Sequence, residues 1–116
     1  MYVAFIVVTA ITIAANVFEA VANLVRAKFV RQNIGAMGLP ESMLPFLGVC
    51  KGAGALGLIA GLAGWRPLGI AAAAGLTLFF VLAVAFHIRK RVLFNIAFPL
   101  AFLGFAIASL GLVIAH

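Results

Sequence analysis

The sequence predicts an all-α protein, an integral membrane four-helix transmembrane bundle. Composition gives the first indication. Of the 116 residues, 67% are hydrophobic and 9% are charged, and the mean hydropathy is +1.33. A soluble domain is about half apolar and about a quarter charged. This apolar fraction exceeds what a small globule can bury in water, and it excludes a disordered chain, which needs low hydrophobicity and high charge.

The second indication is the division of the chain into four apolar blocks. A helix needs roughly 20 apolar residues to cross the hydrocarbon core, and each block is close to that length. Because backbone polar groups find no water in lipid, blocks of this kind form helices. We expect one transmembrane domain over residues 1–116, with spans at about residues 2–24, 44–64, 68–88 and 92–115.

The distribution of charge predicts the orientation. Eight Lys and Arg residues against two acids give a net charge of +6. Six of these cations lie in residues 25–43 and 89–91, two loops that a four-span chain places on the same side. Cytoplasmic loops are enriched in Lys and Arg. We therefore expect a multi-pass protein of the cell membrane with both loops in the cytoplasm and both termini outside. Nucleic acid, the partner that such a charge suggests for a soluble protein, is not expected.

Polar residues in the first predicted span follow a helical period. Spacings of three and four residues connect Thr9, Thr12, Asn16, Glu19, Asn23 and Arg26. Such a stripe lies on one face of a helix, and in lipid that face must turn toward protein or water.

Glu19 requires a partner, because a charged side chain inside a span costs at least about 2.5–3.5 kcal/mol. Lys51 in the second span is the matching cation. Each residue lies about 10 Å from the predicted cytoplasmic edge of its own span. The equal depth predicts a Glu19–Lys51 ion pair.

The other spans add polar groups at a similar level. His87 ends the third span and Asn95 lies one turn into the fourth, where Pro99 frees the carbonyl group of Asn95. We treat these groups as one candidate ligand-binding site, made of Asn16, Glu19, Asn23, Lys51, His87 and Asn95. Two interpretations are open. The cluster fixes how the helices pack, or it forms the polar end of a pocket for a lipophilic ligand such as a quinone.

Other chemistry has less support in the sequence. One His and one acid inside the spans are too few for a metal site, so no metal and no catalytic residue is assigned. Cys50 is the one cysteine, which excludes an internal disulfide. The glycines of the second span resemble a dinucleotide-binding pattern, but they do not follow a strand.

Small residues at helical spacing predict packing faces. In the second span these are the pairs Gly48 with Gly52 and Gly57 with Gly61. In the fourth span a longer stripe is formed by Ala97, Ala101, Gly104, Ala108, Gly111 and Ala115. Such faces also allow a homo-oligomer, and the sequence leaves the oligomeric state open.

Three stretches carry a family resemblance: residues 44–58 (LPFLGVCKGAGALGL), 68–76 (LGIAAAAGL) and 87–89 (HIR). They resemble the DoxX-like family of small four-helix membrane proteins. The resemblance implies kinship with subunits linked to thiosulfate:quinone oxidoreduction and to membrane-associated oxidoreductase complexes. His87 and Arg89 match the His-x-Arg pattern of the family. Lys51 departs from it, because the family leads us to expect an acid, commonly Glu, at that position.

The leading hypothesis is a non-enzymatic or accessory subunit of a quinone-linked redox system in the membrane. Its expected partners are the lipid bilayer, membrane redox proteins and a second copy of the chain. No intrinsic cofactor is expected, only a bound quinone or lipid. Two alternatives stay open. One is a small membrane enzyme or transporter that uses Glu19, Lys51 and His87 to handle protons, and the other is a purely structural subunit of a larger complex.

The orientation can be tested with reporter fusions. Alkaline phosphatase fused after His116 is expected to be active, because the charge bias places that end outside the cytoplasm. The same enzyme fused after Gly38, in the loop over residues 25–43, should be inactive. An inactive fusion at His116 with an active one at Gly38 would reverse the predicted topology.

Overall fold

The structure is a computed structural model that describes residues 2–91 and 96–115. Its helices are α1 (Tyr2–Leu24), α2 (Lys28–Ala36), the 3-10 helix η1 (Glu41–Met43), α3 (Leu44–Leu62), α4 (Arg66–Arg89) and α5 (Ala97–Ala115). Four of them, α1, α3, α4 and α5, are long and apolar enough to cross a membrane. The predicted all-α membrane bundle is confirmed.

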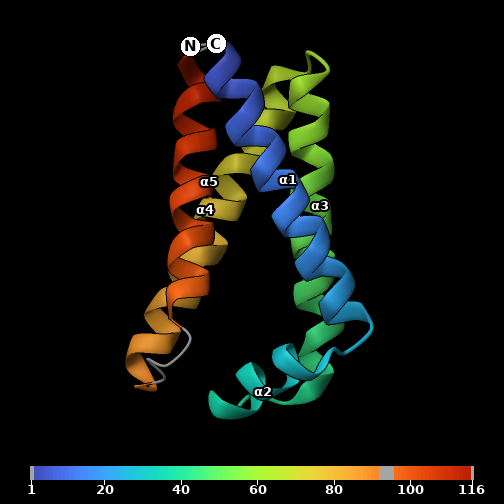
Figure 1. Ribbon diagram of the computed structural model, residues 1–116, viewed down its shortest axis with the longest axis vertical. Helices are drawn as coiled ribbons and strands as arrows, with labels where there is room; N and C mark the ends of the chain where they lie inside the picture. Colours follow the sequence, from blue (N-terminus) through green and yellow to red (C-terminus); the bar gives the residue numbers. More distant parts are fainter. Residues whose placement is uncertain (1, 92–95, 116) are drawn as a thin grey trace.

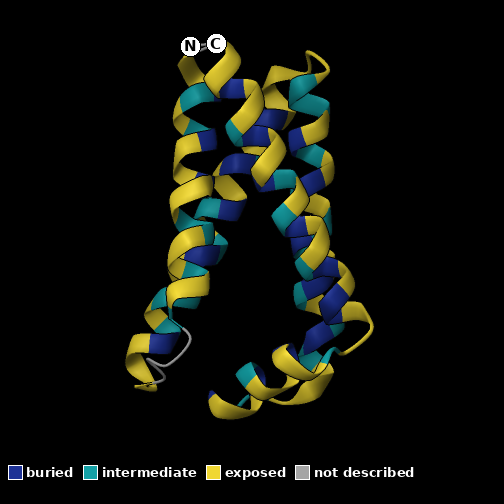
Figure 2. Ribbon diagram, viewed as in Figure 1, coloured by how far each residue is buried: buried dark blue, intermediate teal, exposed yellow. Residues whose placement is uncertain are grey.

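The four long helices form two pairs that separate along the bundle (Figure 1). The pair α1 and α3 meets the pair α4 and α5 at the end that holds both chain termini, here called the terminal end. Toward the opposite end, the α2 end, the pairs move apart and α2 lies across the space between them. Residues 25–43 and 89–91 therefore share one end, as four spans require. Buried residues lie mainly on the faces that the long helices turn toward one another (Figure 2).

Glycines of α3 let the helices approach closely at the terminal end. A Cβ atom added to Gly61 would lie 2.7 Å from the Cα of Gly69 on α4, and one added to Gly57 would lie 2.5 Å from the Cβ of Ala72. At the α2 end, a Cβ on Gly48 would lie 2.9 Å from the Cβ of Asn23 on α1. The α3 glycines thus form packing faces, as predicted.

The prediction for the small residues of the fourth span was wrong about the packing within the bundle. None of the six residues of that stripe is turned inward. All are exposed: Ala97, Ala101, Gly104, Ala108, Gly111 and Ala115. The buried face of α5 carries Ala106, Ser109 and Val113. Ser109 explains why this face of α5 turns inward. Its hydroxyl group needs a hydrogen-bond partner in lipid, and it lies 3.0 Å from the Thr12 hydroxyl group of α1.

The predicted loop over residues 25–43 contains a helix that the sequence analysis did not expect. Val30 and Ile34, one turn apart on α2, are buried against Ala22 of α1 and Leu44 of α3. Arg26 has a left-handed backbone (φ 55°) and reverses the chain between α1 and α2. The spacing of Val30 and Ile34 is the amphipathic signal that could have identified α2.

The connection between α3 and α4 has the predicted length of three residues, but it lies at residues 63–65 instead of 65–67. Gly64 adopts φ +107°, and the Trp65 N–H group bonds the Ala60 carbonyl oxygen at 2.9 Å, which ends α3 at Leu62. Helix α4 then begins at Arg66, with Pro67 in its first turn, where the missing N–H group of a proline costs no helix hydrogen bond. The predicted start of the fourth span, residues 92–95 with Asn95, lies outside the described residues.

Arg66, which the sequence analysis placed in a loop, has a structural role. Its Nε group donates to the Val113 carbonyl oxygen at 3.2 Å, and its guanidinium group also bonds the Ile114 carbonyl. A cation at these carbonyls satisfies the free end of α5 and matches the negative end of the helix dipole.

The contact between α3 and α4 predicts a difference between two glycine substitutions. Gly61→Leu should destabilise the bundle by about 1–3 kcal/mol, because the backbone of Gly69 has no room to move away. Gly104→Leu is the control, since a Cβ atom there meets nothing within 4 Å. Unfolding in a detergent titration measures both. Equal loss of stability in the two variants would contradict the assigned packing.

Candidate functional site

Glu19 on α1 and Lys51 on α3 form the predicted ion pair. The Lys51 Nζ atom lies 3.2 Å from Glu19 Oε1, and the two side chains are only 9% and 17% exposed. On its other side, Lys51 Nζ lies 5.6 Å from the centre of the Phe79 ring of α4. An aromatic face attracts a cation at this distance. Lys51 therefore has contacts with two neighbouring helices, α1 through Glu19 and α4 through Phe79.

The other residues of the stripe that lie within α1 also face inward, whereas Arg26 lies beyond the end of α1 and is exposed. Asn16 and Asn23 are almost completely buried, at 1% and 2% exposure. The Asn16 amide donates to the Thr12 carbonyl oxygen at 2.9 Å, and the Asn23 amide donates to the Leu44 carbonyl oxygen at 3.4 Å. Their positions match the prediction, but their amide donors are used on backbone groups.

The same two asparagines leave acceptors without donors. Within residues 2–91 and 96–115, the side-chain oxygens of Asn16 and Asn23 are buried and have no hydrogen-bond partner. The Glu19 carboxylate accepts a hydrogen bond at Oε1 from Lys51 Nζ, and no hydrogen bond to Oε2 is found among the same residues. Buried acceptors normally have a donor from protein, water or ligand. The interior around α1 is therefore short of hydrogen-bond donors.

His87 belongs to a different contact. Its Nδ1 atom lies 2.7 Å from the Ala83 carbonyl oxygen, and its Nε2 atom lies 3.0 Å from Asn33 Oδ1. A carbonyl group only accepts, so Nδ1 carries a proton. The partner of Nε2 is the Asn33 side-chain oxygen, which also only accepts, so Nε2 donates to it when the ring carries both protons. In the neutral ring, the Asn33 amide must be turned so that its nitrogen donates to Nε2. This contact joins α4 to α2 across the α2 end of the bundle.

The predicted six-residue cluster is therefore only partly assembled. The structure brings Glu19 and Lys51 together, but it gives His87 its own partners two helical turns beyond Phe79, about 12 Å along α4. Asn95 lies outside the described residues. Asn33, which the sequence analysis did not select, is three residues from the buried Val30, and this spacing on an amphipathic helix was the available signal.

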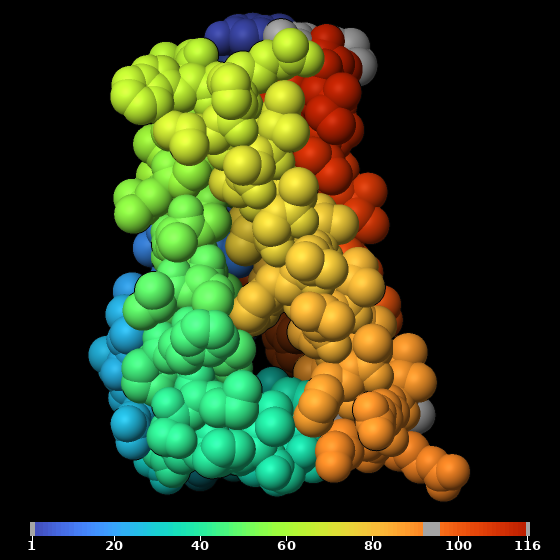
Figure 3. Space-filling view, turned by 180° about the vertical axis from the view of Figure 1, so that it is seen from behind, coloured from blue at the N-terminus to red at the C-terminus, as the bar shows by residue number. Residues whose placement is uncertain are grey.

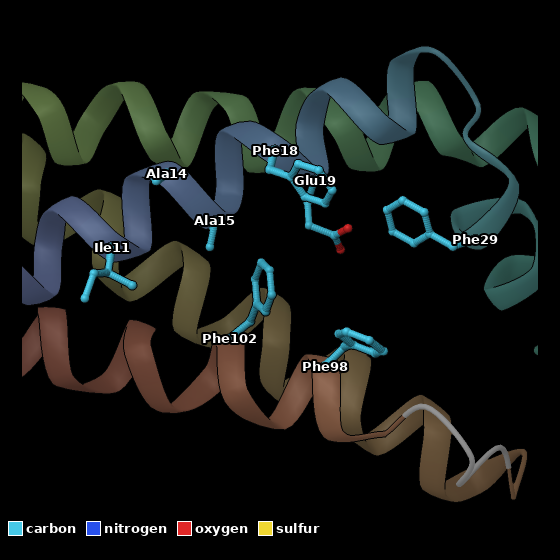
Figure 4. A pocket seen from close by; sticks show the side chains of 8 residues that line it. All are labelled: Ile11, Ala14, Ala15, Phe18, Glu19, Phe29, Phe98 and Phe102. Atoms are coloured by element: carbon cyan, nitrogen blue, oxygen red, sulfur yellow. The ribbon is translucent and has the colours of Figure 1, made fainter.

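A cavity of about 470 Å³ lies beside the ion pair, between α1 and α5 and next to α2 (Figure 4). Its lining residues are Ile11, Ala14, Ala15, Phe18, Glu19, Phe29, Phe98 and Phe102. The Glu19 carboxylate points into this space, among the four aromatic rings. The Phe18 and Phe29 rings are stacked, with centres 6.0 Å apart and an interplanar angle of 11°. On the opposite face, a hollow between α3 and α4 is visible above α2 (Figure 3).

The aromatic lining of the cavity was not among the residues predicted from the sequence. Phenylalanine is ordinary on lipid-facing positions, so its presence in a span points to no site. The one usable signal was the spacing of Phe98 and Phe102, which places both rings on one face of α5. Which other elements supply rings to that face depends on the tertiary structure.

Comparison with known protein families shows to which family the chain is related. Residues 7–109 match the DoxX-like family. The chain belongs to this family. The matched part includes the ion pair, His87 and every residue that lines the cavity. No curated protein and no solved structure matches the chain significantly.

The arrangement in this DoxX-like protein is suited to binding. Within the described residues, no group of three or more His, Cys, Asp or Glu side chains could hold a metal ion. The cavity offers flat apolar surfaces and a single ionisable group, Glu19, fixed in place by Lys51. A ligand with an apolar body and one polar end matches both features.

Reversing the charge of Lys51 tests the ion pair. Lys51→Glu should destabilise the DoxX-like protein by about 3–5 kcal/mol, because it leaves two acids buried at one place. Adding Glu19→Lys should recover part of this loss. Thermal unfolding in detergent measures both variants.

Glu41→Gln is the control for that experiment. Glu41 is half-exposed, 3.7 Å from Arg31 and 3.9 Å from Arg26, so its loss should change stability by no more than about 1 kcal/mol. A harmless Lys51→Glu substitution would show that the buried pair does not form.

Proposed function

We propose that this DoxX-like protein is an accessory subunit of a quinone-linked redox system and that it holds a lipophilic ligand between α1 and α5. The observation that carries the proposal is the aromatic cavity with the Glu19 carboxylate inside it. Its volume of about 470 Å³ lies within the range of ordinary small-molecule sites, roughly 300–1,000 Å³.

The lining suits a flat ring with an apolar tail. Phe18, Phe29, Phe98 and Phe102 supply aromatic faces on which a ring can stack. Glu19 is the polar group that binds the head of the ligand and so orients it. Lys51 holds that carboxylate at 3.2 Å and so fixes the position of the anchor.

The role that follows for the protein's own side chains is to bind and to orient. When bound, a quinone-type molecule supplies the redox chemistry, which the side chains of this site do not provide. The rings exclude water from the apolar body of the ligand, and Glu19 fixes its head. A separate redox partner is then needed to exchange electrons with the ligand, which makes the protein an accessory subunit.

The proposed orientation places the α2 end in the cytoplasm and both termini outside. The charge bias of residues 25–43 and 89–91 supports it. Phe29 of α2 lines the cavity, so the site lies toward this end of the bundle. A partner that approaches from the cytoplasm would meet α2 and the cations around it.

Filling the cavity tests the proposal. Ala15 lines the cavity, and Ala15→Phe should remove most of the free space without touching the ion pair. Lipid extraction and mass spectrometry of gently purified protein should show quinone, in its oxidised or its reduced form, bound to the unmodified chain. At least about tenfold less of the two forms together should be bound to the variant, as expected when the contacts of a ring are lost.

Ala10→Phe is the matched control. Ala10 lies on the same helix, is exposed and does not line the cavity, so this variant should retain the ligand. Quinone content that is equal in all three proteins, or absent from the unmodified protein, would contradict the proposed function.

A further inference from the structure

We propose that the cavity selects ligands whose polar end donates a hydrogen bond, so that it prefers a hydroquinone or phenol to the matching quinone or ether. This inference rests on the proposed function, because it names the chemical form of the cavity ligand. It follows from the hydrogen-bonding capacity of the groups that line the cavity and from the balance of charge beside it.

The first step concerns Glu19. A carboxylate has two oxygens that accept hydrogen bonds and none that donates. Oε1 accepts from Lys51 at 3.2 Å, and Oε2 has no donor among the described residues. The carboxylate points into the cavity (Figure 4). A phenolic O–H group placed at this oxygen would supply a missing donor and form a charge-assisted hydrogen bond.

The second step concerns what a quinone would meet. The other lining residues of the cavity are alanine, isoleucine and phenylalanine, so none of their side chains donates a hydrogen bond. Lys51, the nearby donor, does not line the cavity and is held between Glu19 and the Phe79 ring. A quinone carbonyl would be buried beside a carboxylate oxygen without a donor, which is unfavourable.

The third step concerns charge. Four aromatic rings and a carboxylate could also attract a cation. However, the charge of Glu19 is already balanced by Lys51, and both side chains are largely buried. A ligand cation would leave an unbalanced positive charge inside the bundle, which is costly in a membrane. A neutral donor adds no charge, so a hydroxyl head fits better than an ammonium head.

A pair of redox-inert ligands tests this selectivity. Para-decylphenol carries the O–H donor, whereas para-decylanisole has the same ring and tail with a methyl ether in its place. Binding to the full-length protein in nanodiscs is measured against empty nanodiscs. We expect the phenol to bind at least about tenfold more tightly, the gain typical of a hydrogen bond to a charged acceptor. Under anaerobic conditions, decylubiquinol should likewise bind more tightly than decylubiquinone.

Variants assign the preference to Glu19. The double variant Glu19→Gln with Lys51→Met removes both charges together, and its amide side chain both donates and accepts. The preference for the phenol should therefore disappear. Glu41→Gln, which changes the other acid of the chain, should leave the preference intact. The comparison of phenol with ether on the unmodified protein needs no variant, so the test holds even where the double variant does not fold.

The outcomes separate the two proposals. Equal binding of phenol and ether, lost in Ala15→Phe, would overturn donor selectivity and leave the cavity as a ligand site. Tighter binding of decyltrimethylammonium than of the phenol would overturn it in favour of a cation site. Saturable binding of none of these ligands would overturn the proposed function together with this inference.

Discussion

Two opposite charges inside membrane-spanning helices, Glu19 on α1 and Lys51 on α3, have no favourable position except beside each other, because lipid solvates neither. Their contact at 3.2 Å fixes the rotation of both helices. Once α1 is turned to bury Glu19, Asn16 and Asn23 also face the interior, since they share its helical face. The carboxylate then lies at the edge of the aromatic cavity. The pair thus sets both the packing of α1 and the chemistry of the site.

The space beside the pair exists because the bundle is closed differently at its two ends. At the terminal end, Gly61 and Gly69 bring the backbones of α3 and α4 into contact. At the α2 end, the helices are farther apart, and the contact between His87 and Asn33 joins α4 to α2 across that distance. A bundle packed tightly along its whole length would have no room for a ring between α1 and α5.

Lys51 makes the charge beside the cavity balanced, because it neutralises the Glu19 carboxylate. The family resemblance leads to an acid at that position, and two neighbouring carboxylates would repel each other or share a proton. With a lysine there, the Glu19 carboxylate is neutralised within the protein and remains an acceptor. The absence of donors among the other lining residues is the basis of the preference that we propose, for a neutral ligand with a donating head. The departure from the family pattern is therefore central to the proposed ligand chemistry.

The sequence by itself determined the four membrane-spanning helices, the inward polar stripe of α1 and the partnership of Glu19 with Lys51. These depend on local hydropathy, helical period and the cost of charge in lipid, all of which can be read along the chain. Only the tertiary structure decided that the small residues of α5 face outward, that His87 meets Asn33 and that aromatic rings surround Glu19. In lipid, the apolar faces of one helix differ little in solvation energy. Contacts between distant residues, such as Thr12 with Ser109, decide which face turns inward.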